Sequence, residues 1–177
     1  MLRRASIVVA LALSGCATSS VSRPTHSLDP GPAPKVCHAR GESIWELPDP
    51  TCSPGAVNPD VTPSSARETI CRPGWSSSVR PPVSVTTPEK RVEAKAYGYT
   101  GSLKDTELDH LIPLSIGGAV NDYRNYWLEP GASPNPKDEL ELVLHRRVCS
   151  GAMTLSAAQQ AAAGDWVSAY HLYVKSN

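Results

Sequence analysis

The clearest alternation of apolar and polar residues lies in residues 135–149, and it predicts an amphipathic helix. The apolar stripe, at the three- and four-residue spacing of one helix face, consists of Leu140, Val143, Leu144 and Val148. Asn135 is a good N-cap, and Pro136 suits the first helical position. Gly151 follows as a stop signal. The start, the stripe and the end therefore agree on one helix.

Two short extended runs precede this helix, at residues 107–112 and 124–128. The dipeptide Gly117-Gly118 lies between them and indicates a turn. A strand, a turn, a second strand and a helix predict a ββα unit over residues 107–149. The fold class is therefore α+β, with a small ββα core and additional helices.

A second helix is predicted to start at Thr87-Pro88-Glu89, because a hydroxyl cap followed by Pro and an acid favours a helix N-terminus. It should run to about Tyr97 and stop at Gly98. Its basic residues form either a solvated surface or a phosphate-contacting face; they are Lys90, Arg91 and Lys95. Just before it, residues 81–85 are interpreted as an edge strand or an extended arm.

The C-terminal part is rich in Ala and Gln and predicts helices over residues 154–174. Ser156 and Gln159 stand at the spacing of a capping box. Gly164-Asp165 should break or kink the helix before its second apolar face.

The content of proline and of apolar residues divides the rest of the chain into three regions. Residues 17–36 are Ser, Thr, Pro and Gly with little apolar periodicity, which is typical of a flexible tether. Residues 37–86 are predicted to be a Pro-rich, irregular region held by turns and disulfides. Residues 87–177 then form the folded domain that contains the ββα unit.

The first 16 residues are interpreted as a signal peptide. Arg3 and Arg4 precede an apolar run that is too short to span a bilayer permanently. The tetrapeptide that ends at Cys16 resembles the lipobox of bacterial lipoproteins, which implies lipidation of Cys16 and anchoring in a membrane. Because no Asp follows Cys16, the resemblance implies the outer membrane if the host is Gram-negative. The alternative is an ordinary secretory signal.

Export to an oxidising compartment changes how the other cysteines are interpreted. Four remain after Cys16, namely Cys37, Cys52, Cys71 and Cys149. An even number without CxxC spacing favours disulfides over zinc. Of three possible pairings we favour Cys37–Cys52 with Cys71–Cys149.

Net charge restricts the function. The chain has 17 basic and 17 acidic residues, whereas a protein that coats nucleic acid non-specifically would be clearly basic. Any contact with phosphate must therefore be local.

The candidate chemistry centres on the adjacent pair Asp109-His110, at the end of the first extended run. Further polar side chains follow within 35 residues of His110: Asn125, Asn135, Lys137 and His145. Because neighbouring residues of a strand point to opposite faces, the strand must end or bulge for Asp109 and His110 to reach one site.

Asp109-His110-x-x-Pro113, followed by Gly117-Gly118, Asn125 and a helix start at Asn135, resembles the HNH endonuclease family with its ββα-metal fold. The match covers residues 107–149, about a quarter of the chain, and residues 52–170 resemble exported bacterial proteins with an HNH-like domain.

The resemblance implies a role for each residue. His110 would be the general base that activates water, and Asp109 would bind a divalent metal, Mg²⁺ or alternatively Mn²⁺. Asn125 would fix the backbone that carries His110, and Asn135 would be the last metal ligand. Unlike many members, the chain lacks a third-position His and paired zinc-binding CxxC motifs.

Three residues beside the motif leave alternatives open. Lys137 and Arg124 are candidates for contact with the substrate phosphate, and Lys137 or His145 could take the third motif position instead of Asn135. Asn135 is also the expected N-cap, and one oxygen cannot easily serve both purposes.

The expected function is a metal-dependent endonuclease that hydrolyses phosphodiester bonds of nucleic acid, DNA before RNA, outside the cytoplasm. The alternative is a non-catalytic envelope lipoprotein that uses an HNH-like scaffold for binding or structure. A third hypothesis is an envelope hydrolase that acts on another phosphodiester.

Overall fold

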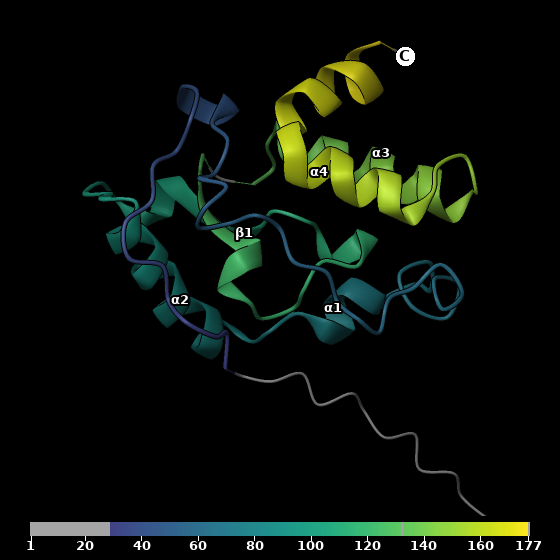
Figure 1. Cartoon of the computed structure of the whole chain (residues 1–177), viewed down its shortest axis with the longest axis horizontal. Coiled ribbons are helices and arrows are strands. Elements are labelled where there is room, and N and C mark those ends of the chain that lie inside the picture. The colour runs from purple at the N-terminus through teal and green to yellow at the C-terminus, as the bar shows by residue number, and fades with distance from the viewer. Residues whose placement is uncertain (1–28, 132, 177) are drawn as a thin grey trace, which may run out of the picture.

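The computed structural model describes residues 29–131 and 133–176, so the predicted signal peptide, Cys16 and the first part of the tether lie outside the described residues. The described chain is mixed α and β, with helices around a small antiparallel sheet (Figure 1). The helices are α1 (Trp75–Val79), α2 (Val83–Ala96), α3 (Pro136–Cys149) and α4 (Leu155–Tyr170). The strands are β1 (Thr106–His110) and β2 (Tyr126–Pro130). Short 3₁₀ turns lie at 43–45, 103–105, 114–116 and 123–125, and a π-helical turn lies at 171–175.

β1 and β2 pair antiparallel, with Thr106 opposite Pro130 and His110 opposite Tyr126. Both expected extended runs are present, but β1 starts and ends earlier than predicted, and β2 starts later. Beyond His110 the amide of Leu111 still bonds the carbonyl of Asn125 at 2.8 Å, but the amide of Ile112 bonds the side chain of Asn125 at 2.9 Å, so the regular ladder ends there. The chain order β1, β2, α3 matches the predicted order of elements.

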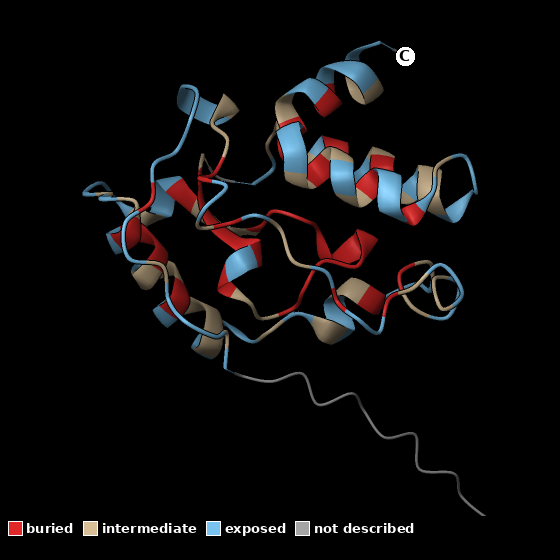
Figure 2. Cartoon of the chain, viewed as in Figure 1, coloured by how far each residue is buried: buried red, intermediate tan, exposed pale blue. Residues whose placement is uncertain are grey.

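The apolar core lies between the segment that follows β1 and the helices α3 and α4. Figure 2 shows buried residues concentrated along that segment and on α4. Its largest members are less than 2% exposed: Trp127, Trp166, Leu111, Ile116, Leu140 and Leu144. The predicted apolar stripe of α3 therefore supplies Leu140 and Leu144 to this core.

The start of α3 follows from local chemistry, as the sequence predicted. The Asn135 side chain accepts hydrogen bonds from the amides of Lys137 and Asp138, and the Asp138 carboxylate accepts one from the Asn135 amide. This reciprocal pair is a capping box that satisfies amides left free in the first turn. The helix ends at Cys149, and Gly151 follows with a φ of +79°.

The prediction for α2 is wrong at its start. The helix begins at Val83, so the residues expected to be an extended arm form its first turn, and Pro88 lies inside it. The amides of Val85 and Thr86 bond the carbonyl of Pro82, which starts the helix ahead of the Thr-Pro signal. Pro88 removes one hydrogen bond, which the rest of the helix tolerates. The predicted end is confirmed, with Gly98 at a φ of +62°.

The N-cap of α4 lies two residues before the predicted capping box. Thr154 is the N-cap, and its hydroxyl accepts a hydrogen bond from the amide of Ala157 at 3.2 Å. Ser156 already lies inside the helix, so its proposed capping role is wrong. The predicted kink is confirmed, because Asp165 has the non-helical angles φ −145° and ψ 87°.

The region 37–86 is not separate from the ββα unit. The amide of Gly55 bonds the carbonyl of Arg124 at 2.9 Å, and Val57 forms a bridge with Gly118. The region also contains α1 and the start of α2, so it is less irregular than predicted. Among the described residues, no helix has the length and apolar character to cross a membrane.

Both predicted disulfides are present. Cys37 is bonded to Cys52 and Cys71 to Cys149, with sequence separations of 15 and 78 residues. The second joins the segment before α1 to the last residue of α3. Two disulfides indicate an oxidising, extracytoplasmic environment.

Removing the disulfide that closes the longer loop should lower the free energy of unfolding more than removing the other. Because it closes 78 residues of chain against 15, Cys71→Ser/Cys149→Ser should lower the free energy of unfolding by about 2–4 kcal/mol, and Cys37→Ser/Cys52→Ser by less. Urea unfolding at pH 7 followed by tryptophan fluorescence would measure both. An equal or larger loss in the Cys37/Cys52 variant would contradict the argument.

Candidate active site

The register of the sheet sends the predicted pair Asp109 and His110 in different directions. Asp109 lies opposite Trp127, and its side chain faces α3, where it contacts Lys137. His110 lies opposite Tyr126, and their rings pack with centroids 4.8 Å apart. β1 remains regular through His110, so the alternation of a strand separates the two side chains.

His110 is held as a neutral imidazole with a defined tautomer. Its Nε2 lies 3.0 Å from the carbonyl oxygen of Val120, and only 4% of the residue is exposed. A carbonyl can only accept, so Nε2 carries the proton and the lone pair is on Nδ1. Burial lowers the pKa of His110 to about 4, so the ring is neutral at pH 7. The hydroxyl of Tyr126 donates to the same carbonyl at 2.8 Å.

Asn125 fixes the segment that connects the two strands. Its Oδ1 accepts from the amide of Ile112 at 2.9 Å, and its Nδ2 donates to the carbonyls of Ile112 and Ala119 at 3.0 Å. The residue is fully buried and lies in the 3₁₀ turn before β2 rather than in the strand itself. These bonds hold the backbone two residues after His110 and one residue before Val120. A part in catalysis stays a prediction.

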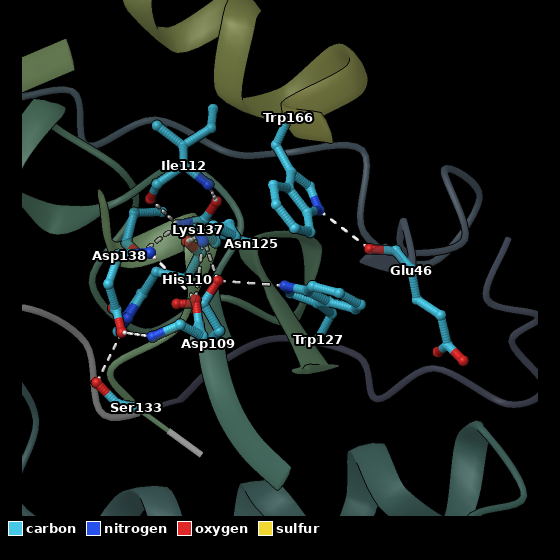
Figure 3. Close-up of polar contacts among 12 residues, drawn as sticks. Glu46, Asp109, His110, Ile112, Asn125, Trp127, Ser133, Lys137, Asp138 and Trp166 are labelled. Atoms are coloured by element: carbon cyan, nitrogen blue, oxygen red, sulfur yellow. Dashed lines mark hydrogen bonds and ion pairs between the residues drawn. The ribbon is translucent and has the colours of Figure 1, made fainter. Parts of the chain in front are cut away.

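Asp109 is engaged by two donors. Its Oδ2 forms an ion pair with Nζ of Lys137 and accepts a hydrogen bond from Nε1 of Trp127 at 3.2 Å. Lys137 also donates to the carbonyl oxygen of His110 at 3.0 Å. Figure 3 shows these contacts converging where β1 ends beside the first turn of α3.

Two glutamates lie on the same face of the sheet as Asp109. Glu107 and Glu129 are directly opposite each other in the register. Burial, and then the negative charge of Asp109, raises the pKa of Glu129 to about 9 and that of Glu107 to about 7. At neutral pH Glu129 therefore carries a proton. Glu129 was not identified from the sequence, although it interrupts an otherwise apolar run.

The two predicted metal ligands each have other hydrogen-bond or ion-pair partners in this arrangement. The Oδ1 of Asn135 accepts from two helix amides, and the Oδ2 of Asp109 is bonded to an ammonium group. Among the described residues, no three His, Cys, Asp or Glu side chains are grouped to hold a metal ion. A divalent ion at Asp109 would also meet the positive charge of Lys137. The requirement for Mg²⁺ or Mn²⁺ stays a prediction.

The remaining predicted side chains lie in other places. Arg124 is exposed and binds the carboxylate of Asp122 with Nε–Oδ1 at 3.0 Å. His145 lies on the α1 side of α3, where its Nε2 is 2.9 Å from the carbonyl oxygen of Ile70. Only Lys137, of the three candidates for the phosphate or third position, reaches Asp109 and the end of β1.

Sequence reasoning missed Arg80, an exposed residue at the end of α1. Its positive charge is among the causes that lower the pKa of His110 and of Glu107, so its guanidinium lies near both. An exposed cation within electrostatic range of a candidate base is a candidate for contact with an anionic substrate. No local signal marks it, because Arg80 stands 30 residues before His110 and only the tertiary fold brings the two together.

Comparisons of the chain with protein-family models, with curated proteins and with solved structures find no match.

Proposed function

We propose that the protein is an HNH-like hydrolase of phosphodiester bonds in nucleic acid, with DNA as the favoured substrate, and that it acts outside the cytoplasm. The observation that carries this proposal is the state of His110. The ring is neutral, its Nε2 proton is bonded to the carbonyl of Val120, and the lone pair is therefore on Nδ1. A general base needs this protonation state and a fixed ring orientation.

The proposed reaction is a direct attack by water. Nδ1 of His110 takes a proton as the water oxygen forms a bond to phosphorus, and the bond from phosphorus to the leaving oxygen breaks. The leaving oxygen takes a proton from solvent, and His110 later returns its proton to solvent. The products are a phosphate monoester and an alcohol, so atoms and charge balance.

Two contacts support the orientation of the base. Asn125 bonds the backbone on both sides of the loop, which keeps the Val120 carbonyl beneath the ring. Arg80 supplies an exposed positive charge beside His110, where a phosphate would approach. This local cation is consistent with a chain that has no net charge.

The proposed location outside the cytoplasm is supported by the disulfides. The disulfides indicate an oxidising environment. We propose in addition that lipid on Cys16 anchors the protein to the bacterial cell envelope, at the outer membrane in a Gram-negative host. Residues 17–28 would then connect the anchor to the described part of the chain.

Two observations favour the non-catalytic alternative, a lipoprotein that uses the same scaffold as a binding module. His110 is only 4% exposed, and Asp109 is already paired with Lys137. Such a protein would bind a partner without changing it. A gel-shift assay with short duplex DNA separates the alternatives, because binding without cleavage supports this second function.

The decisive experiment compares the mature chain (residues 17–177) with His110→Ala. Supercoiled plasmid would be incubated with each protein in buffers containing Mg²⁺, Mn²⁺ or EDTA, and the relaxed form quantified. Loss of the general base should slow nicking by about 10²–10⁴-fold. His38→Ala, at an exposed position next to Cys37, should nick at the wild-type rate.

Two outcomes would contradict the proposed function. One is a wild-type protein that does not nick in any of the three buffers. The other is equal nicking by His110→Ala, which would point to a contaminating nuclease. Near-UV circular dichroism of both variants would establish that each has folded.

A further inference from the structure

Lys137 lies where a metal ion would be expected beside the base. It is the second residue of α3, and only 4% of its side chain is exposed. Its Nζ forms an ion pair with Asp109 and donates to the carbonyl oxygen of His110 at 3.0 Å. One carboxylate oxygen and one carbonyl oxygen are hard donors of the kind that Mg²⁺ prefers. The ammonium therefore occupies the position that joins these two oxygens (Figure 3).

The carboxylate of Asp109 compensates the charge of this buried ammonium. Burying a cation is costly unless an opposite charge and hydrogen-bond acceptors surround it, and here a carboxylate oxygen and a carbonyl oxygen do so. Lys137 therefore places a cation, held by two bonds, at the end of β1.

The neighbouring groups hold this ion pair in place. Trp127 donates to the same Asp109 oxygen at 3.2 Å, so a second donor fixes the carboxylate that faces the ammonium. The capping oxygen of Asn135 bonds the amide of Lys137 itself at 2.8 Å. The cap that starts α3 therefore also sets the direction in which the Lys137 side chain leaves the helix.

We propose, resting on the proposed phosphodiester hydrolysis, that Lys137 is a built-in cation that replaces the divalent metal of an HNH-like site. It is a positioning residue: it neutralises Asp109 and holds the last carbonyl of β1, which fixes the backbone of His110. Cleavage therefore requires no divalent ion. The sequence resemblance implies a bound Mg²⁺ ion, and in this proposal Lys137 takes the place of that ion.

The first test uses wild-type protein alone. The mature chain, dialysed against EDTA, should nick supercoiled plasmid at a rate within about twofold of its rate in Mg²⁺. Loss of nicking in EDTA with recovery in Mg²⁺ would overturn the inference and leave the proposed function intact. Absence of nicking in every buffer would overturn the proposed function and this inference together.

The second test measures metal binding without activity. Free Mn²⁺, followed by its electron paramagnetic resonance signal, should remain undiminished when wild-type protein is added. In Lys137→Ala the freed carboxylate of Asp109 should bind Mn²⁺ and reduce the signal, and Asp109→Asn/Lys137→Ala should not. If the wild-type protein binds Mn²⁺ and Asp109→Asn abolishes that binding, the inference is wrong.

The third test asks whether an added ion restores what the ammonium supplied. Lys137→Ala should nick at least tenfold more slowly than wild type in EDTA and recover part of that loss in Mn²⁺. Lys104→Ala, at an exposed position in the 3₁₀ turn before β1, should behave as wild type in both buffers. Equal rates for Lys137→Ala and wild type in EDTA would contradict a positioning role. If Lys137→Ala does not fold, the wild-type tests decide alone.

Discussion

Gly118→Ala should cost the protein about 4 kcal/mol or more of its free energy of unfolding. A Cβ at this position would stand 1.7 Å from the carbonyl oxygen of Ile112 and 2.8 Å from Nδ2 of Asn125. The first neighbour is backbone, and the second is bonded to Ile112 and Ala119, so neither can move aside without breaking the loop's hydrogen bonds. Urea unfolding would measure the loss.

The matched control is Gly164→Ala in α4. No atom lies within 4 Å of the position that its Cβ would take, and its φ is not positive. Because Ala favours a helix over Gly, this change should be neutral or stabilising by up to about 1 kcal/mol. A Gly118→Ala variant as stable as wild type would mean that the Asn125 loop is not packed as described.

The free energy of unfolding of Glu93→Gln, compared with that of wild type at the same pH, should increase as the pH rises. Glu93 is fully buried on α2, and neither carboxylate oxygen has a hydrogen-bond partner within the described part of the chain. Burial raises its pKa from 4.5 to about 8, and the tyrosines Tyr97 and Tyr123 lie near enough for its charge to raise their pKa values too.

The direction of the pH effect follows from the raised pKa. Below about pH 4.5 the carboxyl of Glu93 is protonated in both the folded and the unfolded chain, so it contributes no pH dependence. Between pH 4.5 and 8 the unfolded chain releases this proton and the folded chain keeps it, so the stability of wild type falls as pH rises. Above pH 8 both states are ionised, and the loss is constant.

Chemical unfolding at several pH values would measure this difference. The free energy of unfolding of Glu93→Gln, relative to wild type, should increase by about 3–4 kcal/mol between pH 4.5 and pH 8. Any constant cost of the buried amide cancels in that comparison. Glu68→Gln, at an exposed position, should show no such increase. A difference independent of pH would show that Glu93 ionises normally in the folded protein.

Local signals in the sequence predicted the parts of the fold that depend on local chemistry. The cap at Asn135, the end of α2 at Gly98 and the kink at Asp165 were all expected. Each depends on backbone groups within a few residues, so neighbouring sequence is enough. The start of α2 was missed because the Thr87-Pro88-Glu89 signal, although locally favourable, lies inside a helix that already begins at Val83.

The candidate site was predicted as a set of residues but not as an arrangement. The sequence drew attention to Asp109, His110, Asn125 and Lys137, and the structure brings all four to one end of the sheet. Sequence spacing could not show which face of β1 each side chain would take, because that depends on the register with β2. Arg80 and Glu129 could not be found, since their proximity arises only on folding.

Local sequence was enough to predict the helix that carries Lys137, the turn at Gly117-Gly118 and the cysteines available for two disulfides. These features depend on backbone conformation and residue chemistry. The fold was needed to show that Asp109 faces an ammonium group while His110 faces the Val120 carbonyl. The physical reason is that charge pairing and tautomer depend on distances between segments far apart in the chain. Those same distances place a lysine where the sequence resemblance implied a metal.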